Sequence, residues 1–201
     1  MSTLKVSTIE PLDSDTTNTI TIGSAGDTIA FTGTTTGVGK IGQTLQTTVT
    51  EASFTSASTS FTTITGLTVA ITPSASSSKV LVDFDICGGV DAYNGVTAFR
   101  LMRDSTPIYI ADSATNYTQS THGGLRGSLD DNSGFLVNIK YMDSPSTASQ
   151  VVYSVQVRSE SASYTYKLNR MGNDTSGQGY SFRSASNVIA QEVLAWHQLL
   201  E

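Results

Sequence analysis

The sequence predicts an all-β protein: a short N-terminal β arm followed by a two-sheet β-sandwich, jelly-roll-like, of about eight strands. Two observations support this prediction. Serine and threonine together account for 58 of the 201 residues (28 and 30), whereas charged residues account for only 14%. Apolar side chains also recur at every second position in one stretch after another, which is the period of a pleated strand. Threonine favours strands because its branched β-carbon restricts the side chain.

Residues 1–42 form the predicted arm. Two short strands carry one pair of apolar side chains each, Ile20 with Ile22 and Ile29 with Phe31. Between Asp13 and Gly42 only six large apolar residues occur, and they supply roughly 9 to 18 kcal/mol of gross burial. Ordering the backbone of that stretch costs roughly 30 to 60 kcal/mol. We therefore expect the arm to dock, through these four side chains, on other copies of the chain or on a larger assembly.

Residues 43–201 form the predicted sandwich, which we call the knob. A first strand is expected from Leu45 to Phe54. The stretch from Phe61 to Asp104 then contains three strands separated by polar turns, which predicts an antiparallel meander with short hairpins. In the second of these strands the residues on one face are all apolar: Val80, Val82, Phe84 and Ile86.

The second half of the knob repeats the pattern in Phe135–Met142 and Val151–Arg158. Both strands have apolar residues on the two faces; Leu136 and Met142, for example, alternate with the apolar set of their strand. A strand that is apolar on both faces needs a cover on both. The pattern therefore predicts that an outer face of the sandwich is buried against another subunit.

Four shorter stretches complete the knob. Pro107 predicts an edge strand because proline has no N–H to donate to a ladder. The polar connection 112–133 has room for one short strand, and residues 164–168 indicate another. The last stretch, Ser186–Trp196, fits either a strand or a helix by its apolar spacing. We predict a strand, because no helix cap precedes it.

The charge and composition exclude several classes of partner. The net charge is −6 and no run of Lys or Arg occurs, so we expect no nucleic-acid partner. No apolar run approaches the roughly 20 residues that span a bilayer, and the N-terminus lacks a signal-peptide core, so we expect no membrane insertion and no export. Cys87 is the single cysteine and excludes an intrachain disulfide.

The sequence offers little for catalysis, and we predict a protein without enzymatic activity, cofactor or metal. His122 and His197 are the only histidines, and neither belongs to a recognised catalytic or metal-ligand spacing. Asp83 and Asp85 share one face of a strand and could hold a cation together with Asp91. We favour the alternative, in which these carboxylates keep an outer face polar.

Aromatic and amide side chains in the predicted loops are candidates for glycan or host contact. Rings can stack on sugars while neighbouring amides bind their hydroxyl groups. The candidate site consists of Tyr93, Asn94, Tyr117 and Tyr180, with Asn116 and Asn173 as further loop amides.

Several stretches resemble one family. The N-terminal part resembles the same region of tail-fibre and appendage virion proteins of tailed phages that infect marine bacteria, cyanophages among them. The matching stretches are Leu4–Ile9, Thr19–Gly23 and Gly26–Ile29. Three further stretches are similar to the C-terminal domain of many of these proteins: Phe61–Ser74, Ser76–Val82 and Phe99–Ile108. The resemblance implies a trimeric virion component with a knob similar to C1q or tumour-necrosis-factor jelly rolls.

The sequence thus leads to one hypothesis and two alternatives. The first is a non-enzymatic phage virion protein, a short tail fibre or appendage whose knob contacts the host surface. It would form a homotrimer, attach to other virion proteins of the tail or capsid through its arm, contact a host cell-surface glycan, and be made in the host cytoplasm. The alternatives are a capsid decoration (cement) protein and, less favoured, a glycan-degrading tailspike, which needs paired carboxylates in a groove.

Overall fold

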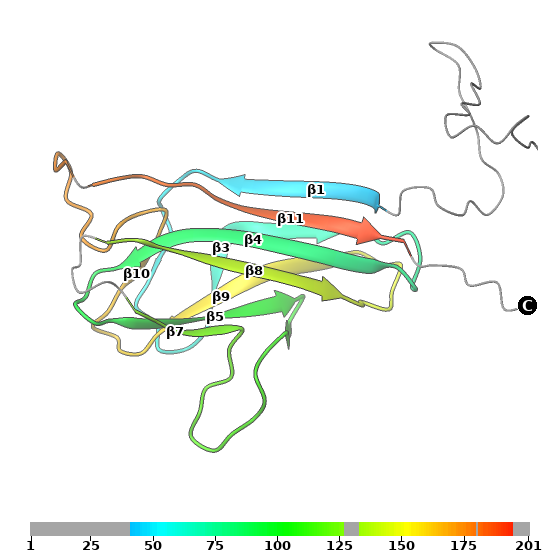
Figure 1. Ribbon diagram of the computed structural model, residues 1–201, viewed down its shortest axis with the longest axis horizontal. Coiled ribbons are helices and arrows are strands. Elements are labelled where there is room, and N and C mark those ends of the chain that lie inside the picture. Colours follow the sequence, from blue (N-terminus) through cyan, green and yellow to red (C-terminus); the bar gives the residue numbers. More distant parts are fainter. Residues whose placement is uncertain (1–40, 127–132, 180, 195–201) are drawn as a thin grey trace, which may run out of the picture. The chain divides into compact units, whose positions relative to one another are not determined.

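The computed structural model describes residues 41–126, 133–179 and 181–194. The predicted docking residues Ile20, Ile22, Ile29 and Phe31 lie outside the described residues. The described residues belong to one compact unit, residues 40–201. They form eleven strands in two antiparallel sheets packed face to face (Figure 1). The prediction of an all-β, two-sheet sandwich is therefore confirmed.

The first sheet is built around β4 (Lys79–Val90). One edge of β4 pairs with β8 (Phe135–Asp143) along its length. The other edge pairs first with β11 (Ser186–Val193) and then, near its end, with β10 (Tyr166–Leu168). Two outer strands complete the sheet: β1 (Ile41–Val49) beside β11, and the two-residue β2 (Thr55–Ser56) beside β10.

The second sheet is built around β9 (Val151–Ser159). It lies between β3 (Thr62–Ile71) and β5 (Val96–Arg103). The far edge of β5 pairs with β6 (Thr106–Ile108) and β7 (His122–Arg126). The predicted edge strand at Pro107 and the predicted short strand inside 112–133 are both present.

The long strands alternate between the sheets along the chain. β1, β4, β8 and β11 belong to the first sheet, and β3, β5 and β9 to the second. Neighbours within a sheet are therefore distant in sequence, as Val188 of β11 beside Phe84 of β4 illustrates. This connectivity is that of a jelly roll.

The predicted meander over Phe61–Asp104 is wrong. Its three stretches are strands, but β4 lies in the opposite sheet from β3 and β5, and β9 lies between these two. The expected short hairpins are replaced by connections that cross from one sheet to the other. The reason is physical: a period of two tells which side of a strand is buried, but both sheets bury their inner sides in the same core.

The core lies between the sheets. Val80, Val82, Phe84 and Ile86, predicted to share one face, are all fully buried. Aromatic rings fill the end of the core where β4 meets β10: Phe99 and Tyr166 pack edge to face, with centroids 5.4 Å apart and planes at 84°. Such packing adds specific geometry to apolar burial.

The limits of two predicted strands change, and the type of a third is settled. The opening strand runs from Ile41 to Val49 rather than from Leu45 to Phe54, because its partner β11 begins opposite Val49. The strand expected over 164–168 begins at Tyr166, since the Tyr164 N–H is used in a turn to the Ser161 carbonyl. The last stretch is a strand, Ser186–Val193, as predicted.

Candidate functional site

The outer face of the first sheet carries an unusual mixture of apolar and charged side chains. We use the term outer face for the outward-pointing residues of β4, β8 and β11. On β8, Leu136 is 60% exposed and Met142 is 41% exposed. The strand register places further outward residues beside them: Leu81, Asp83, Asp85 and Cys87 on β4, Asn138 and Lys140 on β8, and Asn187, Ile189 and Gln191 on β11.

A hydrogen-bonded polar group occupies the middle of the outer face. The Lys140 ammonium lies 2.7 Å from a carboxylate oxygen of Asp83. The Asn138 amide donates to both carboxylates, at 3.1 Å to Asp83 and 2.7 Å to Asp85. Asn187 donates to the second oxygen of Asp85 at 3.4 Å. The hydrogen bond and the charge of Asp83 raise the pKa of Lys140, so the ion pair persists at neutral pH.

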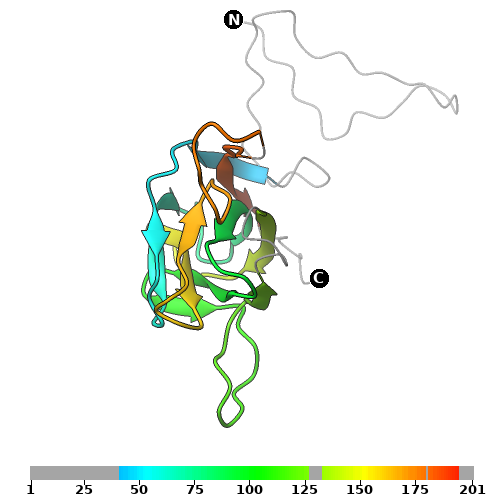
Figure 2. The ribbon, with the colours of Figure 1, turned by 90° about the vertical axis from the view of Figure 1, so that its left-hand side faces the viewer.

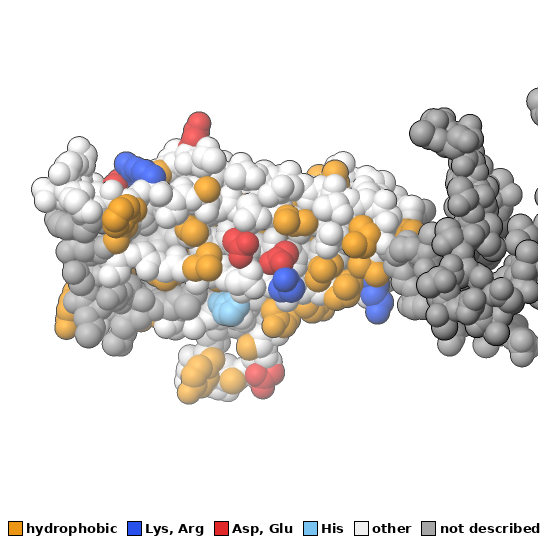
Figure 3. All heavy atoms as spheres, turned by 45° about the horizontal axis from the view of Figure 1, so that its top comes forward, with side chains coloured by type: hydrophobic (Ala, Val, Ile, Leu, Met, Phe, Trp, Pro, Cys, Tyr) orange, Lys and Arg blue, Asp and Glu red, His pale blue; other side chains and the backbone are white. Residues whose placement is uncertain are grey.

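Apolar side chains lie on both sides of this polar group. Leu81 pairs with Met142 towards one end of the face, and Cys87 pairs with Leu136 towards the other. Figure 3 shows the same arrangement, with hydrophobic side chains surrounding a few acidic and basic ones. Lys140 already pairs with Asp83 within the chain, and the amides of Asn138 and Asn187 donate to Asp85. A second protein surface that covers the face would therefore meet an internally hydrogen-bonded group, in which Asp85 has no cationic partner among the described residues.

The carboxylates Asp83 and Asp85 are not joined by Asp91. Asp91 lies in the turn after β4, where it accepts a hydrogen bond of 2.6 Å from the Thr165 N–H and faces the Lys167 ammonium at 3.9 Å. Across the described part of the chain, no three His, Cys, Asp or Glu side chains come together as a metal site. Asp83 and Asp85 instead contribute to the polarity of the outer face, which is the role favoured from the sequence.

The turn between β4 and β5 holds the first pair of predicted glycan-contact residues. Tyr93 is 62% exposed and available for stacking. Asn94 has a positive φ of 63°, a conformation that asparagine tolerates better than most residues. Its side-chain oxygen is buried without a hydrogen-bond partner among the described residues. Asn94 therefore shapes the turn, and Tyr93 is its exposed group.

Tyr117 lies on a different element, the long loop between β6 and β7. This loop projects from the body of the sandwich in both views (Figures 1 and 2). Tyr117 is 79% exposed. The loop is ordered by its own hydrogen bonds, including Ala111 N–H to Ser120 O at 3.2 Å and the Gln119 amide to Ala111 O at 2.7 Å.

The remaining predicted contact residues lie elsewhere. Tyr180 lies outside the described residues. Asn173 accepts a 2.8 Å hydrogen bond from the Thr175 hydroxyl within the connection before β11, and Asn116 is exposed in the projecting loop with a φ of 67°. Tyr93 and Tyr117 stand on separate loops, so each would contact a ligand from its own element.

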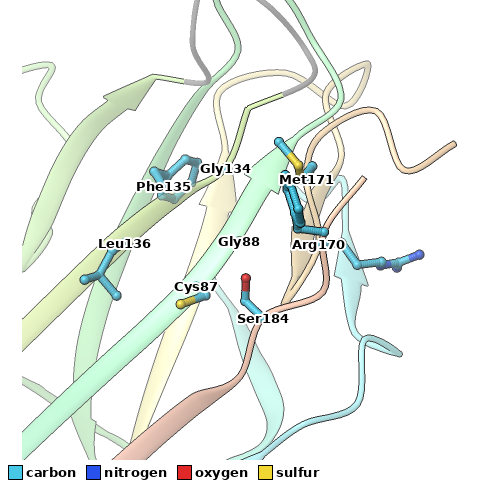
Figure 4. Close-up of a pocket in the computed structure, with 9 residues that line it drawn as sticks. Cys87, Gly88, Gly134, Phe135, Leu136, Arg170, Met171 and Ser184 are labelled. Atoms are coloured by element: carbon cyan, nitrogen blue, oxygen red, sulfur yellow. The ribbon is translucent and has the colours of Figure 1, made fainter. Parts of the chain in front are cut away.

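A shallow apolar pocket adjoins the Cys87 end of the outer face (Figure 4). It has a volume of about 290 Å³ and includes Cys87, Phe135, Leu136, Met171 and Phe182 in its lining. Arg170 also borders it, but its guanidinium points away from Cys87 (Figure 4). Burial, and then the charge of Asp85, raise the pKa of the Cys87 thiol. The thiol is therefore a protonated lining group at neutral pH.

A second shallow pocket, of about 240 Å³, lies against the outward side of the second sheet, under the projecting loop. Arg158 and Glu160 line it with Thr118 and Ser120. The sequence did not indicate this site, because Arg158 and Glu160 sit at the end of a strand while the hydroxyl groups come from a loop some 40 residues earlier. From the sequence, the alternation in β9 indicated only that Arg158 points outward.

The histidines do not form a catalytic group within the described residues. His122 begins β7, opposite Phe99 of β5. His197 lies outside the described residues. Within the described ranges, no helix is long and apolar enough to cross a membrane.

No protein-family model matches the sequence, and no curated protein matches it. Among solved structures, a structure of infectious bursal disease virus, Gx strain, is similar to the chain with a TM-score of 0.37 and 12% sequence identity. The match covers 79% of this chain, which spans 35% of the length of that one.

Proposed function

We propose that this chain is a non-enzymatic virion structural protein of a tailed phage. It is a short tail fibre or appendage that assembles as a homotrimer through the outer face of the first sheet. The observation that carries the proposal is the outer face itself. Leu136 and Met142 are 60% and 41% exposed there, on either side of a polar group in which Lys140 pairs with Asp83 and two amides donate to Asp85.

An apolar sheet face is favourable to cover because each buried leucine or methionine side chain gains about 1.5 to 3 kcal/mol. The pairing of Lys140 with Asp83 balances two of the three charges of the polar centre, and the amides of Asn138 and Asn187 hold the third, the Asp85 carboxylate. Identical copies usually assemble with closed rotational symmetry, and in a threefold ring the outer face of each copy contacts a different surface of its neighbour. We propose three subunits because the sequence resembles trimeric phage appendage proteins.

The side-chain arrangement supports a structural role over a glycan-cleaving one. Glycoside hydrolysis uses two carboxyl groups on opposite sides of a bond, one protonated and one free. Asp83 and Asp85 share one exposed sheet face and the same Asn138 amide. Lys140 also lies 2.7 Å from Asp83 on this face. The two carboxylates are therefore neighbours on one surface and do not stand on opposite sides of a bond.

Capsid decoration is the second candidate, since a trimer of the same knob could project from a shell as well as from a tail. The test has two parts. Light scattering of the purified full chain at micromolar concentration should give three times the chain mass of 21.2 kDa. A density map of intact particles then locates the knob: copies on the tail support the appendage, copies on the shell support decoration, and a monomer in solution contradicts the trimer.

A further inference from the structure

The pocket under the projecting loop, which we call the Arg158 pocket, is formed by two distant parts of the chain. β5 and β9 supply its floor, with Ala98 and Arg158 as paired neighbours in the register. Thr118 and Ser120 of the loop supply its wall. Gly123 and Gly124 of β7 complete the wall without side chains of their own.

Arg158 is the charged group that distinguishes this pocket. Its guanidinium donates one hydrogen bond, of 2.8 Å, to the Thr118 hydroxyl. Three other arginines pair with carboxylates: Arg103 with Asp143, and both Arg170 and Arg183 with Asp174. Arg158 has no carboxylate within ion-pair distance among the described residues. Since a guanidinium has five N–H donors, most of its donors remain available to a ligand.

Glu160 supplies an acceptor in the same pocket. One of its carboxylate oxygens accepts the Val96 N–H at 3.2 Å, which positions the side chain at the rim. The other oxygen has no partner among the described residues. The pocket therefore offers three groups to one occupant: the Arg158 guanidinium, a Glu160 carboxylate oxygen and the Ser120 hydroxyl.

We propose that this pocket binds one carboxylate-bearing sugar ring of a surface polysaccharide. Arg158 pairs with the sugar carboxylate in the two-point geometry that a guanidinium favours. Glu160 and Ser120 bind ring hydroxyl groups. The volume of about 240 Å³ lies below the roughly 300 to 1,000 Å³ of most small-molecule sites, which restricts the occupant to a single ring. The inference rests on the proposed function, because an appendage brings the pocket to a cell surface.

The projecting loop links this pocket to a residue already selected from the sequence. Thr118, which holds the loop to Arg158, follows Tyr117 directly. Tyr117 is therefore the neighbour in sequence of a lining residue, and in this proposal its exposed ring stacks on the next sugar of the same polysaccharide. Arg158 contributes charge selectivity, and Tyr117 contributes contact area.

The test compares two probes, glucuronic acid and glucose, by NMR titration of the full chain. Wild type should bind glucuronic acid at least about tenfold more tightly than glucose, since a charge-assisted hydrogen bond contributes about 1.5 to 3 kcal/mol. Arg158→Gln should abolish this preference. Arg100→Gln is the matched control, because Arg100 lies on the same sheet face but is held by Gln156 at 2.6 Å and by the Phe61 ring. Its preference should equal that of wild type.

A second variant separates ligand binding from support of the loop. Thr118→Val removes the hydrogen bond to Arg158 but keeps the guanidinium, so the preference for glucuronic acid should survive. Equal binding of both sugars by wild type, or a preference that persists in Arg158→Gln, would overturn the inference. If the chain is a trimer found in particles but binds both sugars equally, only this inference is contradicted. If the chain is a monomer but binds glucuronic acid more tightly than glucose, only the proposed assembly is contradicted.

Discussion

Glu192 accepts two hydrogen bonds of 2.6 Å from Ser74, one from its backbone N–H and one from its hydroxyl. The other carboxylate oxygen accepts the Gln43 amide at 2.9 Å. Glu192 is 1% exposed and has no cationic partner among the described residues. The carboxylate thus joins the last strand to the first strand and to the turn between the two sheets, using hydrogen bonds alone.

This arrangement predicts a loss of stability in acid. Burial acts to raise the pKa of Glu192, but the hydrogen bonds from Ser74 and Gln43 outweigh it and lower the pKa to about 2 from an ordinary 4.5. A lowered folded-state pKa gives stability that is full above about pH 4.5 and is lost as the pH falls towards 2. The free energy of unfolding, measured by urea denaturation, should drop by about 2 to 3 kcal/mol across that window.

The variant Glu192→Gln tests the origin of this effect. It should be less stable than wild type at pH 7 and should lose less stability between pH 4.5 and 2. Glu51→Gln is the control, since Glu51 is exposed and should leave the acid profile unchanged. An acid profile of Glu192→Gln that matches wild type would show that other carboxylates cause the loss.

Asn169 is the second buried polar residue that joins strands, and we predict that its removal is severe. It is fully buried; its amide donates to the carbonyls of Val49 at 2.7 Å and Glu51 at 3.0 Å, and its oxygen accepts the Ser186 hydroxyl at 2.6 Å. Asn169→Ala leaves these groups unpaired in the interior. The free energy of unfolding should fall by about 3 kcal/mol or more in urea denaturation.

Two variants divide the effect of Asn169 between its side chain and its backbone, whose φ is 56°. Asn169→Gly relieves the backbone strain that alanine would suffer, so it should be the milder variant by roughly 1 kcal/mol. Asn169→Asp replaces the donating amide by an acceptor facing two carbonyl groups and should be at least as damaging as alanine. If all three variants were as stable as wild type, water would have to replace Asn169 as the hydrogen-bond partner of the Val49 and Glu51 carbonyls and the Ser186 hydroxyl.

The sequence pattern predicted where the long strands lie and which side of each is buried, but it did not predict which strands pair. Alternation placed Val82 and Phe84 on the buried side of β4, and both are fully buried. It could not show that β4 pairs with β8 and β11, which begin 45 and 96 residues after β4 ends (135 − 90 and 186 − 90). Every strand of a sandwich presents the same pattern to the common core, so the choice of sheet depends on connections that the pattern does not contain.

The same limit applies to the candidate sites. The apolar residues Leu136 and Met142 on the second face of β8 were visible in the sequence, and the structure exposes both. The polar group between them requires the register that aligns Asp83 with Lys140 and Asp85 with Asn138. The Arg158 pocket requires a loop to fold over a strand. Composition identifies polar residues, but only tertiary contacts decide which of them meet.

The outer face predicts how the trimer can be broken. Leu136→Asp together with Met142→Asp places two charges where burial is expected, at a cost of several kcal/mol in the assembled state. The double variant should be monomeric by light scattering. Its urea unfolding as a monomer should remain cooperative, because both side chains are exposed within one chain.

Ala70→Asp provides the matched control, since Ala70 is an exposed apolar residue of β3 in the opposite sheet. It should remain trimeric. If Ala70→Asp dissociates the assembly while the β8 double variant does not, the interface uses the second sheet and the outer face has another role.

The described core explains why the knob should not need the predicted arm. Its buried apolar residues run from Ile64 to Ala190, and the first strand contributes Val49 at its margin. Shortening the chain before Ile41 therefore removes none of these side chains. The arm's candidate docking residues, Ile20 and Ile22 among them, are the ones expected to meet other virion proteins.

Deleting residues 1–39 should therefore leave a knob that melts cooperatively but is missing from purified particles. The melt tests folding, and mass spectrometry of particles tests incorporation. Ile20→Asp with Ile22→Asp is the milder variant: it keeps the chain length and should still reduce incorporation, because charges replace side chains expected to be buried. A truncated chain that fails to fold would make residues 1–39 part of the core, and one that still enters particles would place the attachment surface on the knob.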